Sequence, residues 1–395
     1  MRSIAVPGSV LITFLAAAIP TTSARAQPQP LGDEQVIDRA VAFFACPAIA
    51  TAGDGSALMA WARETSPWEA QVVARQLGVD GALAPTRLIA GRRHGGYFDA
   101  PDVAAVPSGS VVVWVDSGAV SQPPLPLVAY PRRATSLDEQ GVPRRTQRLG
   151  NPGSLVSPRP GGGFVVVERL EQRHALAMQL LDAGGRPLAA RREIVRTVPY
   201  SAPYPQRVLH LPDGGFIVAW FLAEHHGFIL AEWAQRFDAA GRQRRLFRLL
   251  AAPEHDIGWS ARHLALGADG RLAVLALDGD VTTLRLFDRD GALLGGPVVV
   301  DEGAIVPLAV GVAPHGVLVL TTDGDPSTAT SVYGRLFDLV ASPLSPWFHV
   351  SVPTGEPQSF GCASVAWATD HWLAVWARSA APFSSAELVA QRLSP

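Results

Sequence analysis

The stretch Gly215-Phe216-Ile217-Val218-Ala219-Trp220, followed after a polar loop by Ala234-Gln235-Arg236-Phe237-Asp238-Ala239-Ala240-Gly241, decides the fold. A β-rich apolar run, a loop, a second such run and a turn of the form Asp-x-x-Gly are together typical of a β-hairpin that leads into another strand. The same pattern recurs along the chain at intervals of about fifty residues, the kind of self-similarity that marks a repeat architecture.

Three columns of residues define seven copies of this repeat. The large apolar residue before the turn is found at Leu77, Leu137, Leu181, Phe237, Phe287, Phe337 and Leu393. The turn residue that follows it is Gly78, Asp138, Asp182, Asp238, Asp288, Asp338 and Ser394. At the end of the preceding apolar run lie Trp61, Trp114, Glu168, Trp220, Ala276, Thr321 and Trp376. A recurrent tryptophan at this place indicates packing between repeats rather than catalysis.

Each copy contains four short strands, which at this spacing describe one blade of a β-propeller. The seventh copy stops after its third strand, at Pro395, and its missing fourth strand is found in the segment that begins at Pro30. The segment from Pro30 to Ile37 is similar to the outer strand from Pro187 to Ile194. The sequence therefore predicts an all-β, seven-bladed propeller over residues 27–395, closed by an N-terminal strand that completes the last blade.

The first 26 residues predict a cleaved secretory signal. Arg2 is followed by an apolar stretch from Val10 to Ile19 and by the small-x-small pattern at Ala24-Arg25-Ala26. We therefore expect an exported protein, periplasmic or extracellular, with no membrane insertion. A formal net charge of −2 excludes the basic character that nucleic-acid binding needs. We expect a monomer with an unknown protein or glycan partner.

The two cysteines occupy nearly the same inner-strand position in the first and last repeats. Cys46 lies fifteen residues before Trp61, and Cys362 lies fourteen before Trp376. These repeats become neighbours only when the ring closes, and an exported protein with one such pair favours a disulfide. Two buried thiols are the alternative.

Candidate chemistry is concentrated in the loops of repeats four to six. These loops are Glu224-His225-His226, Glu254-His255-Asp256, Asp278-Gly279-Asp280 and Asp323-Gly324-Asp325. We single out as ligand-binding candidates His225, His226, His255, Asp256, Asp280 and Asp323, with His225, His226 and His255 as candidate metal ligands. A divalent metal held there could activate water. No complete metal-binding spacing is present, and Asp-Gly is also what a tight turn prefers.

Arginines and aromatic residues supply two further candidate surfaces. The arginines of three predicted outer strands are Arg144, Arg145 and Arg148, then Arg191, Arg192 and Arg196, then Arg242, Arg244, Arg245 and Arg248. Charge on an outer strand discourages edge-to-edge aggregation, and the alternative is a basic rim for an anionic polysaccharide. Loop aromatics that could stack on sugar rings are Trp68, Tyr97, Tyr200, Tyr204 and Trp259.

The G-F-x-V-x-W and Q-R-x-D-x-x-G pattern resembles repeats of secreted bacterial propeller-type repeat proteins. This resemblance implies the fold and export and carries no catalytic residues over. No nucleophile elbow, phosphate-cradling loop, dinucleotide fingerprint or sialidase-type S-x-D-x-G-x-T-W box is found. We predict a non-catalytic exported binding or scaffold propeller without a cofactor. The alternative is a metal-dependent hydrolase or lyase, whose stoichiometric metal a His225/His226 double alanine variant would lose.

Overall fold

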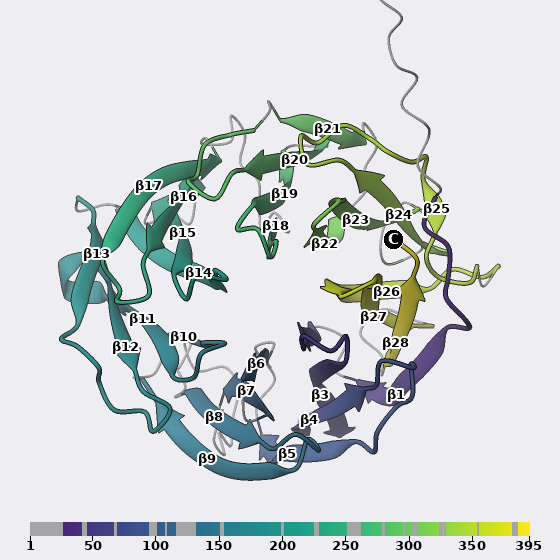
Figure 1. Ribbon diagram of the computed structural model, residues 1–395, viewed down its shortest axis with the longest axis horizontal. Helices are drawn as coiled ribbons and strands as arrows, with labels where there is room; N and C mark the ends of the chain where they lie inside the picture. Colours follow the sequence, from purple (N-terminus) through teal and green to yellow (C-terminus); the bar gives the residue numbers. More distant parts are fainter. Residues whose placement is uncertain are drawn as a thin grey trace, which may run out of the picture.

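The computed structural model shows a ring of seven four-stranded antiparallel blades around a central opening (Figure 1). It describes residues 27–41, 46–66, 69–94, 101–106, 109–115, 132–150, 154–198, 201–224, 229–250, 262–278, 281–294, 297–301, 307–323, 327, 329–353, 355–380 and 386–395. The predicted fold class and the predicted closure are confirmed. The predicted signal, residues 1–26, lies outside the described residues.

Within each blade the strands follow one another from the centre of the ring outward. Blade one contains β2 (Ala48–Thr51), β3 (Ala57–Ser66), β4 (Glu69–Leu77) and β5 (Arg87–His94). Blade two contains β6 (Asp102–Val106), β7 (Gly109–Val115), β8 (Arg132–Leu137) and β9 (Pro143–Leu149). Blade three contains β10 (Leu155–Pro158), β11 (Phe164–Leu170), β12 (Ala175–Leu181) and β13 (Arg192–Arg196), with a short 3-10 helix, η1 (Glu171–Arg173), between its middle strands.

The remaining blades repeat this order. Blade four contains β14 (Ser201–His210), β15 (Phe216–Glu224), β16 (Ile229–Phe237) and β17 (Gln243–Leu250). Blade five contains β18 (Arg262–Leu266), β19 (Leu272–Asp278), β20 (Val281–Phe287) and β21 (Val298–Asp301). Blade six contains β22 (Pro307–Ala313), β23 (Gly316–Thr322), β24 (Val332–Phe337) and β25 (Phe348–His349). Blade seven contains β26 (Ser359–Ala368), β27 (His371–Ser379), β28 (Ala386–Leu393) and β1 (Gln35–Val41).

The core consists of seven clusters of buried apolar side chains, one at each junction between neighbouring blades. Strand β15 shows why its sequence is a continuous apolar run. Successive side chains of a strand point to opposite faces, so Phe216, Val218 and Trp220 pack against blade three while Ile217 and Ala219 pack against blade five. Both faces of the strand are therefore buried, and no polar position is left in the run.

The recurrent tryptophans lie in these junctions, at 0% to 2% relative exposure for Trp61, Trp114, Trp220 and Trp376. Each packs against the blade that precedes its own. In blade three the same position is occupied by Glu168, whose carboxylate accepts from the Arg191 guanidinium at 2.8 Å. An ion pair between two strands of that blade thus replaces an apolar wedge.

The Asp-x-x-Gly turns share one hydrogen-bond pattern. In blade four the Gly241 amide donates to the Asp238 carbonyl at 2.9 Å, and the Asp238 side chain accepts from the amides of Ala240 and Arg242. Gly241 has a φ of +72°, a left-handed conformation that only glycine adopts without strain. In blade one, where Gly78 replaces the aspartate, Asp80 provides the carboxylate that accepts from the Ala82 amide at 2.9 Å.

In three blades, an arginine of the third strand forms a hydrogen bond with the preceding blade. Arg75, Arg285 and Arg335 each donate to a main-chain carbonyl on the outer strand of the preceding blade, namely to Ile37, Leu249 and Val300 respectively. These arginines occupy the column of Gln235 in the repeat, so this contact is part of the repeat pattern.

Closure of the ring takes place between blades seven and one. Strand β1 pairs antiparallel with β28, for example through Val36 and Val389, and it also bridges to β3 through Val41 and Arg63. The two blades therefore form one eight-stranded sheet. The predicted likeness of the two outer segments holds in detail, since Pro30 bridges to Leu393 as Pro187 bridges to Leu181.

The Cys46–Cys362 disulfide is confirmed and joins the same two blades, with the two Cα atoms 4.7 Å apart. Such bonds persist in oxidising compartments, while export itself stays a prediction. Within the part of the chain that the structure describes, no helix has the length and apolar character needed to cross a membrane.

Asp38 on β1 adds a third link to this closure. Its Oδ2 atom accepts hydrogen bonds from Trp61 Nε1 at 2.8 Å and from Arg63 Nε at 2.7 Å, both on β3. We expect Asp38→Ala to lower the free energy of unfolding by about 3 kcal/mol, because it leaves a buried indole N–H and a partly buried guanidinium without their acceptor. Urea unfolding measures this loss.

The control for this prediction is Asp33→Ala, which removes an exposed carboxylate from the same N-terminal segment. This control should change stability by less than about 0.5 kcal/mol. Asp38→Asn keeps one acceptor oxygen and should fall between the two variants. Equal effects of Asp38→Ala and Asp33→Ala would contradict the proposed link.

Candidate functional site

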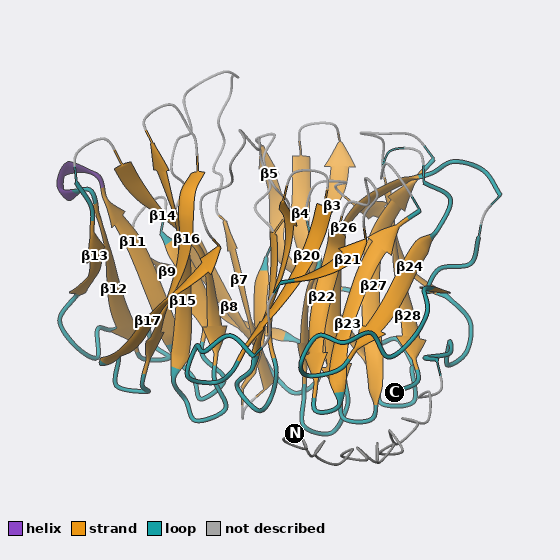
Figure 2. Ribbon diagram, turned by 90° about the horizontal axis from the view of Figure 1, so that it is seen from above, coloured by secondary structure: helices purple, strands orange, loops and turns teal. Residues whose placement is uncertain are grey.

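The predicted loop candidates lie mostly outside the described residues. This holds for His225, His226, His255, Asp256 and Asp280. Figure 2 shows the ring from the side, with the strands of the blades running between its two ends. Among the residues that the structure does describe, no group of three histidine, cysteine or acidic side chains could hold a metal ion. The metal site therefore stays a prediction.

Asp323, the remaining loop candidate, is described and lies just after β23. Its Oδ1 atom accepts from the amides of Thr330 at 2.7 Å and Ser331 at 3.3 Å, and its Oδ2 atom accepts from the Thr330 hydroxyl. Desolvation favours a raised pKa for this carboxyl, but these hydrogen bonds outweigh it and lower the pKa. Both carboxylate oxygens of Asp323 are thus used in hydrogen bonds to residues 330 and 331, which lie just before β24.

A different set of polar residues meets in the central channel. This hollow has a volume of about 650 Å³ and is lined by the innermost strands of all seven blades, β2, β6, β10, β14, β18, β22 and β26. Its charged and histidine side chains, Asp102, Arg159, Arg207, His210 and His263, all come from blades two to five, as does Ser157, while blades one and seven add the hydroxyl residues Thr51 and Ser364. The opposite wall, from blades six, seven and one, consists mainly of alanine, valine and glycine with Trp367. The channel thus has one polar and one largely apolar side.

Register explains why three of these side chains meet. Asp102, Arg207 and His263 pair with Val113, Ala219 and Leu275 respectively. Each partner directly precedes the tryptophan column of its own blade, at Trp114, Trp220 and Ala276. Equivalent positions of neighbouring blades lie at the same height, so the three side chains form one level of the channel.

A chain of hydrogen bonds crosses blades two, three and four. The Ser157 hydroxyl donates to Asp102 Oδ2 at 2.8 Å and lies 3.1 Å from His210 Nε2. A serine hydroxyl has a single proton, which is given to Asp102, so His210 donates from Nε2 to the Ser157 oxygen. Burial raises the pKa of Asp102, against the opposing effects of Arg207 and of the Ser157 hydrogen bond.

Both channel histidines are neutral at neutral pH. Burial, together with the nearby Arg159 charge, lowers the pKa of His210 to about 4. Burial also lowers the pKa of His263 to about 4, with a further contribution from Arg207, although its hydrogen bond to the Pro307 carbonyl at 3.0 Å opposes this shift. The positive charge of the channel therefore comes from its arginines.

Arg207 is the arginine whose side chain is available to a ligand. It is exposed to the channel, and its guanidinium makes no hydrogen bond or ion pair with any residue that the structure describes. It lies directly after an irregularity in the pairing of β14 with β15, between Pro205 and Arg207. Arg159, by contrast, donates to the carbonyl of Ala239 at 3.1 Å, near the end of the channel.

The repeat pattern in the sequence does not point to Asp102, Ser157, Arg207, His210 or His263. A signal was nevertheless present, because the inner-strand position at the level of Arg207 is Ala48, Leu155, Ala309 or Ser364 in other blades. Asp102, Arg207 and His263 occupy an inner-strand position that holds small or apolar residues in most other blades. With the register known, this contrast points to the site.

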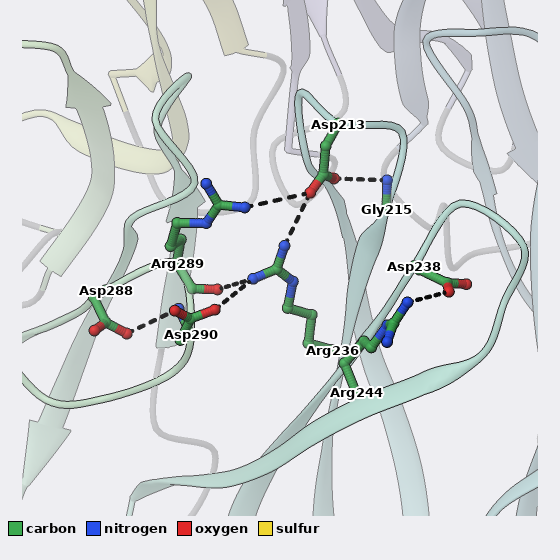
Figure 3. A network of polar contacts seen from close by, with 8 residues as sticks. All are labelled: Asp213, Gly215, Arg236, Asp238, Arg244, Asp288, Arg289 and Asp290. Carbon is green, nitrogen blue, oxygen red and sulfur yellow. Dashed lines mark hydrogen bonds and ion pairs between the residues drawn. The ribbon is translucent and has the colours of Figure 1, made fainter.

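Among the described residues, five of the ten arginines of the predicted surfaces pair with neighbouring carboxylates. Arg144 pairs with Asp138 at 2.6 Å, Arg191 with Glu168 at 2.8 Å and Arg196 with Glu193 at 2.7 Å. In blade four, Arg242 pairs with Asp238 at 2.7 Å, and Arg244 pairs with the same carboxylate at 2.9 Å, the second pair being drawn in Figure 3. Arg245 on the same strand is exposed and makes no side-chain bond to a described residue.

Comparison with known proteins shows the fold. No protein-family model and no curated protein matches this chain. Among solved structures, an ulvan lyase, which is a polysaccharide lyase, is similar with a TM-score of 0.57 at 12% identity, over 92% of this chain and 95% of that one. Its complex with a glycan of glucuronate and sulfated rhamnose gives a TM-score of 0.55 at 12% identity, over the same shares of the two chains, 92% and 95%. A protein of unknown function from Dyadobacter fermentans gives 0.50 at 11% identity, over 93% and 99%.

Proposed function

We propose that this protein is an exported binding propeller that receives a carboxylated sugar of an anionic glycan in its central channel. The observation that carries this proposal is Arg207, a guanidinium exposed in a partly enclosed hollow that makes no hydrogen bond or close ion pair with a described residue and interacts only at longer range with Asp102. A planar guanidinium binds a carboxylate through two parallel hydrogen bonds. Such an arrangement favours an acidic ligand over a neutral one.

The two-sided lining of the channel supports a sugar as the rest of the ligand. A pyranose ring has hydroxyl groups at its edge and an apolar C–H face. The neutral histidines offer hydrogen-bond partners on one wall, while Trp367 and small apolar residues form most of the other. A volume of about 650 Å³ lies within the range of small-molecule sites.

Glucuronate is the first probe, because the similar ulvan lyase was solved with a glucuronate-containing glycan. We expect calorimetric titration to show binding of glucuronate and much weaker binding of glucose. Arg207→Gln should lower the glucuronate affinity at least about tenfold, since a charge-assisted hydrogen bond contributes about 1.5 to 3 kcal/mol.

The matched control is Arg186→Gln, which removes an exposed arginine from a turn of blade three. Its glucuronate affinity should equal that of the wild type. Binding that Arg207→Gln leaves intact, or an absence of glucuronate binding by the wild type, would refute the proposal.

The second candidate function is proton-transfer chemistry on the same glycan, favoured by the His210–Ser157–Asp102 chain. A lyase would convert the probe glycan into an unsaturated product, which ultraviolet absorbance detects. Binding without turnover supports the non-catalytic role. The metal-dependent hydrolase or lyase rests on His225, His226 and His255, and the metal content of the purified protein tests it.

A further inference from the structure

We propose that a hollow between blades four and five binds a second acidic residue of the glycan whose first residue enters the channel. The channel half of this inference rests on the proposed function. The hollow, which we call the arginine hollow, has a volume of about 530 Å³. Its charged lining is Asp213, Arg236, Asp238, Arg242, Arg244, Arg245, Arg289 and Asp290.

The arginine hollow has a surplus of positive charge. Its lining contains five arginines and three aspartates, a difference of +2. The chain as a whole has a net charge of −2, so this basic character is local. Arg245 has no described side-chain partner, and Arg289 has only a distant one, Asp213 at 3.8 Å. These two guanidiniums provide the surplus that an anionic ligand would meet.

The other arginines are held in place by the aspartates, as Figure 3 shows. Arg236, whose side chain is only 12% exposed, donates to Asp213 and to Asp290, each at 2.9 Å. It also donates to the Arg289 carbonyl at 2.6 Å. This one side chain therefore links the turn of blade four to the turn of blade five and fixes the floor of the hollow.

Asp238 holds the arginines of β17. Desolvation opposes its ionisation, but hydrogen bonds from the Arg242 amide and side chain, with the charges of Arg242 and Arg244, lower its pKa to about 2. It is therefore ionised at neutral pH and keeps both guanidiniums oriented. Binding to arginines that are already ordered costs less conformational entropy than binding to mobile ones.

The hollow and the channel share a wall. Asp213 lines the arginine hollow, while Pro212, Gly214 and Gly215 of the same turn line the channel. Arg159 supports this wall by donating to the carbonyls of Gly214 at 3.5 Å and Ala239 at 3.1 Å. A single turn thus separates the two cavities, and an extended glycan that crosses it contacts both.

An acidic oligosaccharide fits this arrangement better than a single sugar acid. Two linked sites raise affinity by effective concentration when the ligand spans them. We therefore expect a tetrasaccharide of galacturonate to bind at least about tenfold more tightly than galacturonate itself. Maltotetraose, a neutral tetrasaccharide, should not show this gain.

The test compares two double variants by calorimetric titration. Arg245→Gln/Arg289→Gln removes the surplus charge of the arginine hollow and should reduce tetrasaccharide affinity about tenfold while leaving monosaccharide affinity unchanged. The matched control, Arg145→Gln/Arg148→Gln, removes two exposed arginines from β9, an outer strand of blade two. It should bind both probes as the wild type does.

The outcomes separate this inference from the proposed function. Tetrasaccharide affinity unchanged in Arg245→Gln/Arg289→Gln would overturn the second site, even if glucuronate bound through Arg207. A loss of tetrasaccharide affinity in both double variants would show non-specific attraction of polyanions and would also overturn the second site. The same conclusion would follow if polyphosphate of the same charge competed equally well for the protein. A loss confined to the Arg245/Arg289 variant supports the hollow, even where Arg207→Gln has no effect and the channel proposal fails.

Discussion

Replacing Cys46 and Cys362 by serine will lower the free energy of unfolding by about 5 kcal/mol, by the chain-entropy account of a disulfide that closes a very long loop. The two cysteines are separated by 316 residues, so the unfolded chain loses much freedom when they are joined. For a protein of this size, the expected decrease in melting temperature is about 5 °C or more. Guanidinium unfolding and thermal melting under oxidising conditions measure the effect.

Reduction provides the internal control for this prediction. A reductant should shift the unfolding midpoint of the wild type toward that of the double serine variant and leave the variant unchanged. A loss below about 1 kcal/mol would mean that the β1–β28 pairing alone closes the ring, and that the disulfide adds little to it.

Acidification from about pH 7 to about pH 5 will destabilise the protein through the two channel histidines. Their pKa values in the folded protein are about 4, against an ordinary value of 6.5. In this pH range the unfolded chain binds protons at these histidines and the folded protein does not. The free energy of unfolding therefore falls as the pH drops through 6.5 toward 4. Each histidine contributes about 3 to 4 kcal/mol across the whole window, because one pKa unit corresponds to about 1.4 kcal/mol.

The variant His210→Gln/His263→Gln tests the origin of this effect. Glutamine can donate the hydrogen bonds to Ser157 and to the Pro307 carbonyl but does not titrate, so the urea midpoint should change little over the same pH range. Asp102 acts in the opposite direction, since its raised pKa means that its cost at neutral pH is relieved in acid. An undiminished pH dependence in the histidine variant would assign the effect to other groups.

Carboxylates account for a separate and more acidic transition. The pKa values of Asp138, Asp238 and Asp323 are lowered in the folded protein. The ionised carboxylates stabilise the folded protein fully when the pH is above the pKa of an aspartate in the unfolded chain. This stabilisation is lost as the pH falls through their lower pKa in the folded protein. This loss lies below about pH 4 and does not overlap the histidine window.

The sequence predicts most of the fold because the repeat is fixed by local chemistry. Asp238 and Gly241 are required by the turn itself, so an aspartate and a glycine three residues apart recur in most blades, and Trp220 fills a junction that a tryptophan also fills in three other blades. The N-terminal strand could be recognised from Pro30 because its role at the edge of blade seven is the same as that of Pro187 in blade three.

The candidate site is much less predictable, and the inner strands show why. They vary in length from four residues in β2 to ten in β14, and their pairing is irregular near Arg207, Ala309 and Ala363. The irregularities lie beyond the level of Arg207, and the turn between the two strands differs in length, so this level lies twelve residues before the tryptophan column in some blades and thirteen in others. The loops proposed from the sequence, those of His225 and His255, lie outside the described residues.

The union of blades seven and one into a single sheet has a consequence for biosynthesis. Strand β1 is made before every other described strand, and its partner β28 is made after all of them. Until β28 has been synthesised, β1 lacks its main pairing partner, and the ring cannot close. Folding of the complete ring is therefore a slow step of high contact order that follows the synthesis of β28. A chain that ends before Ala386 would leave the apolar junction of Ile37 and Val41 without Ala386, Leu388 and Ala390, and the apolar surface so exposed is of the kind that chaperones and proteases recognise.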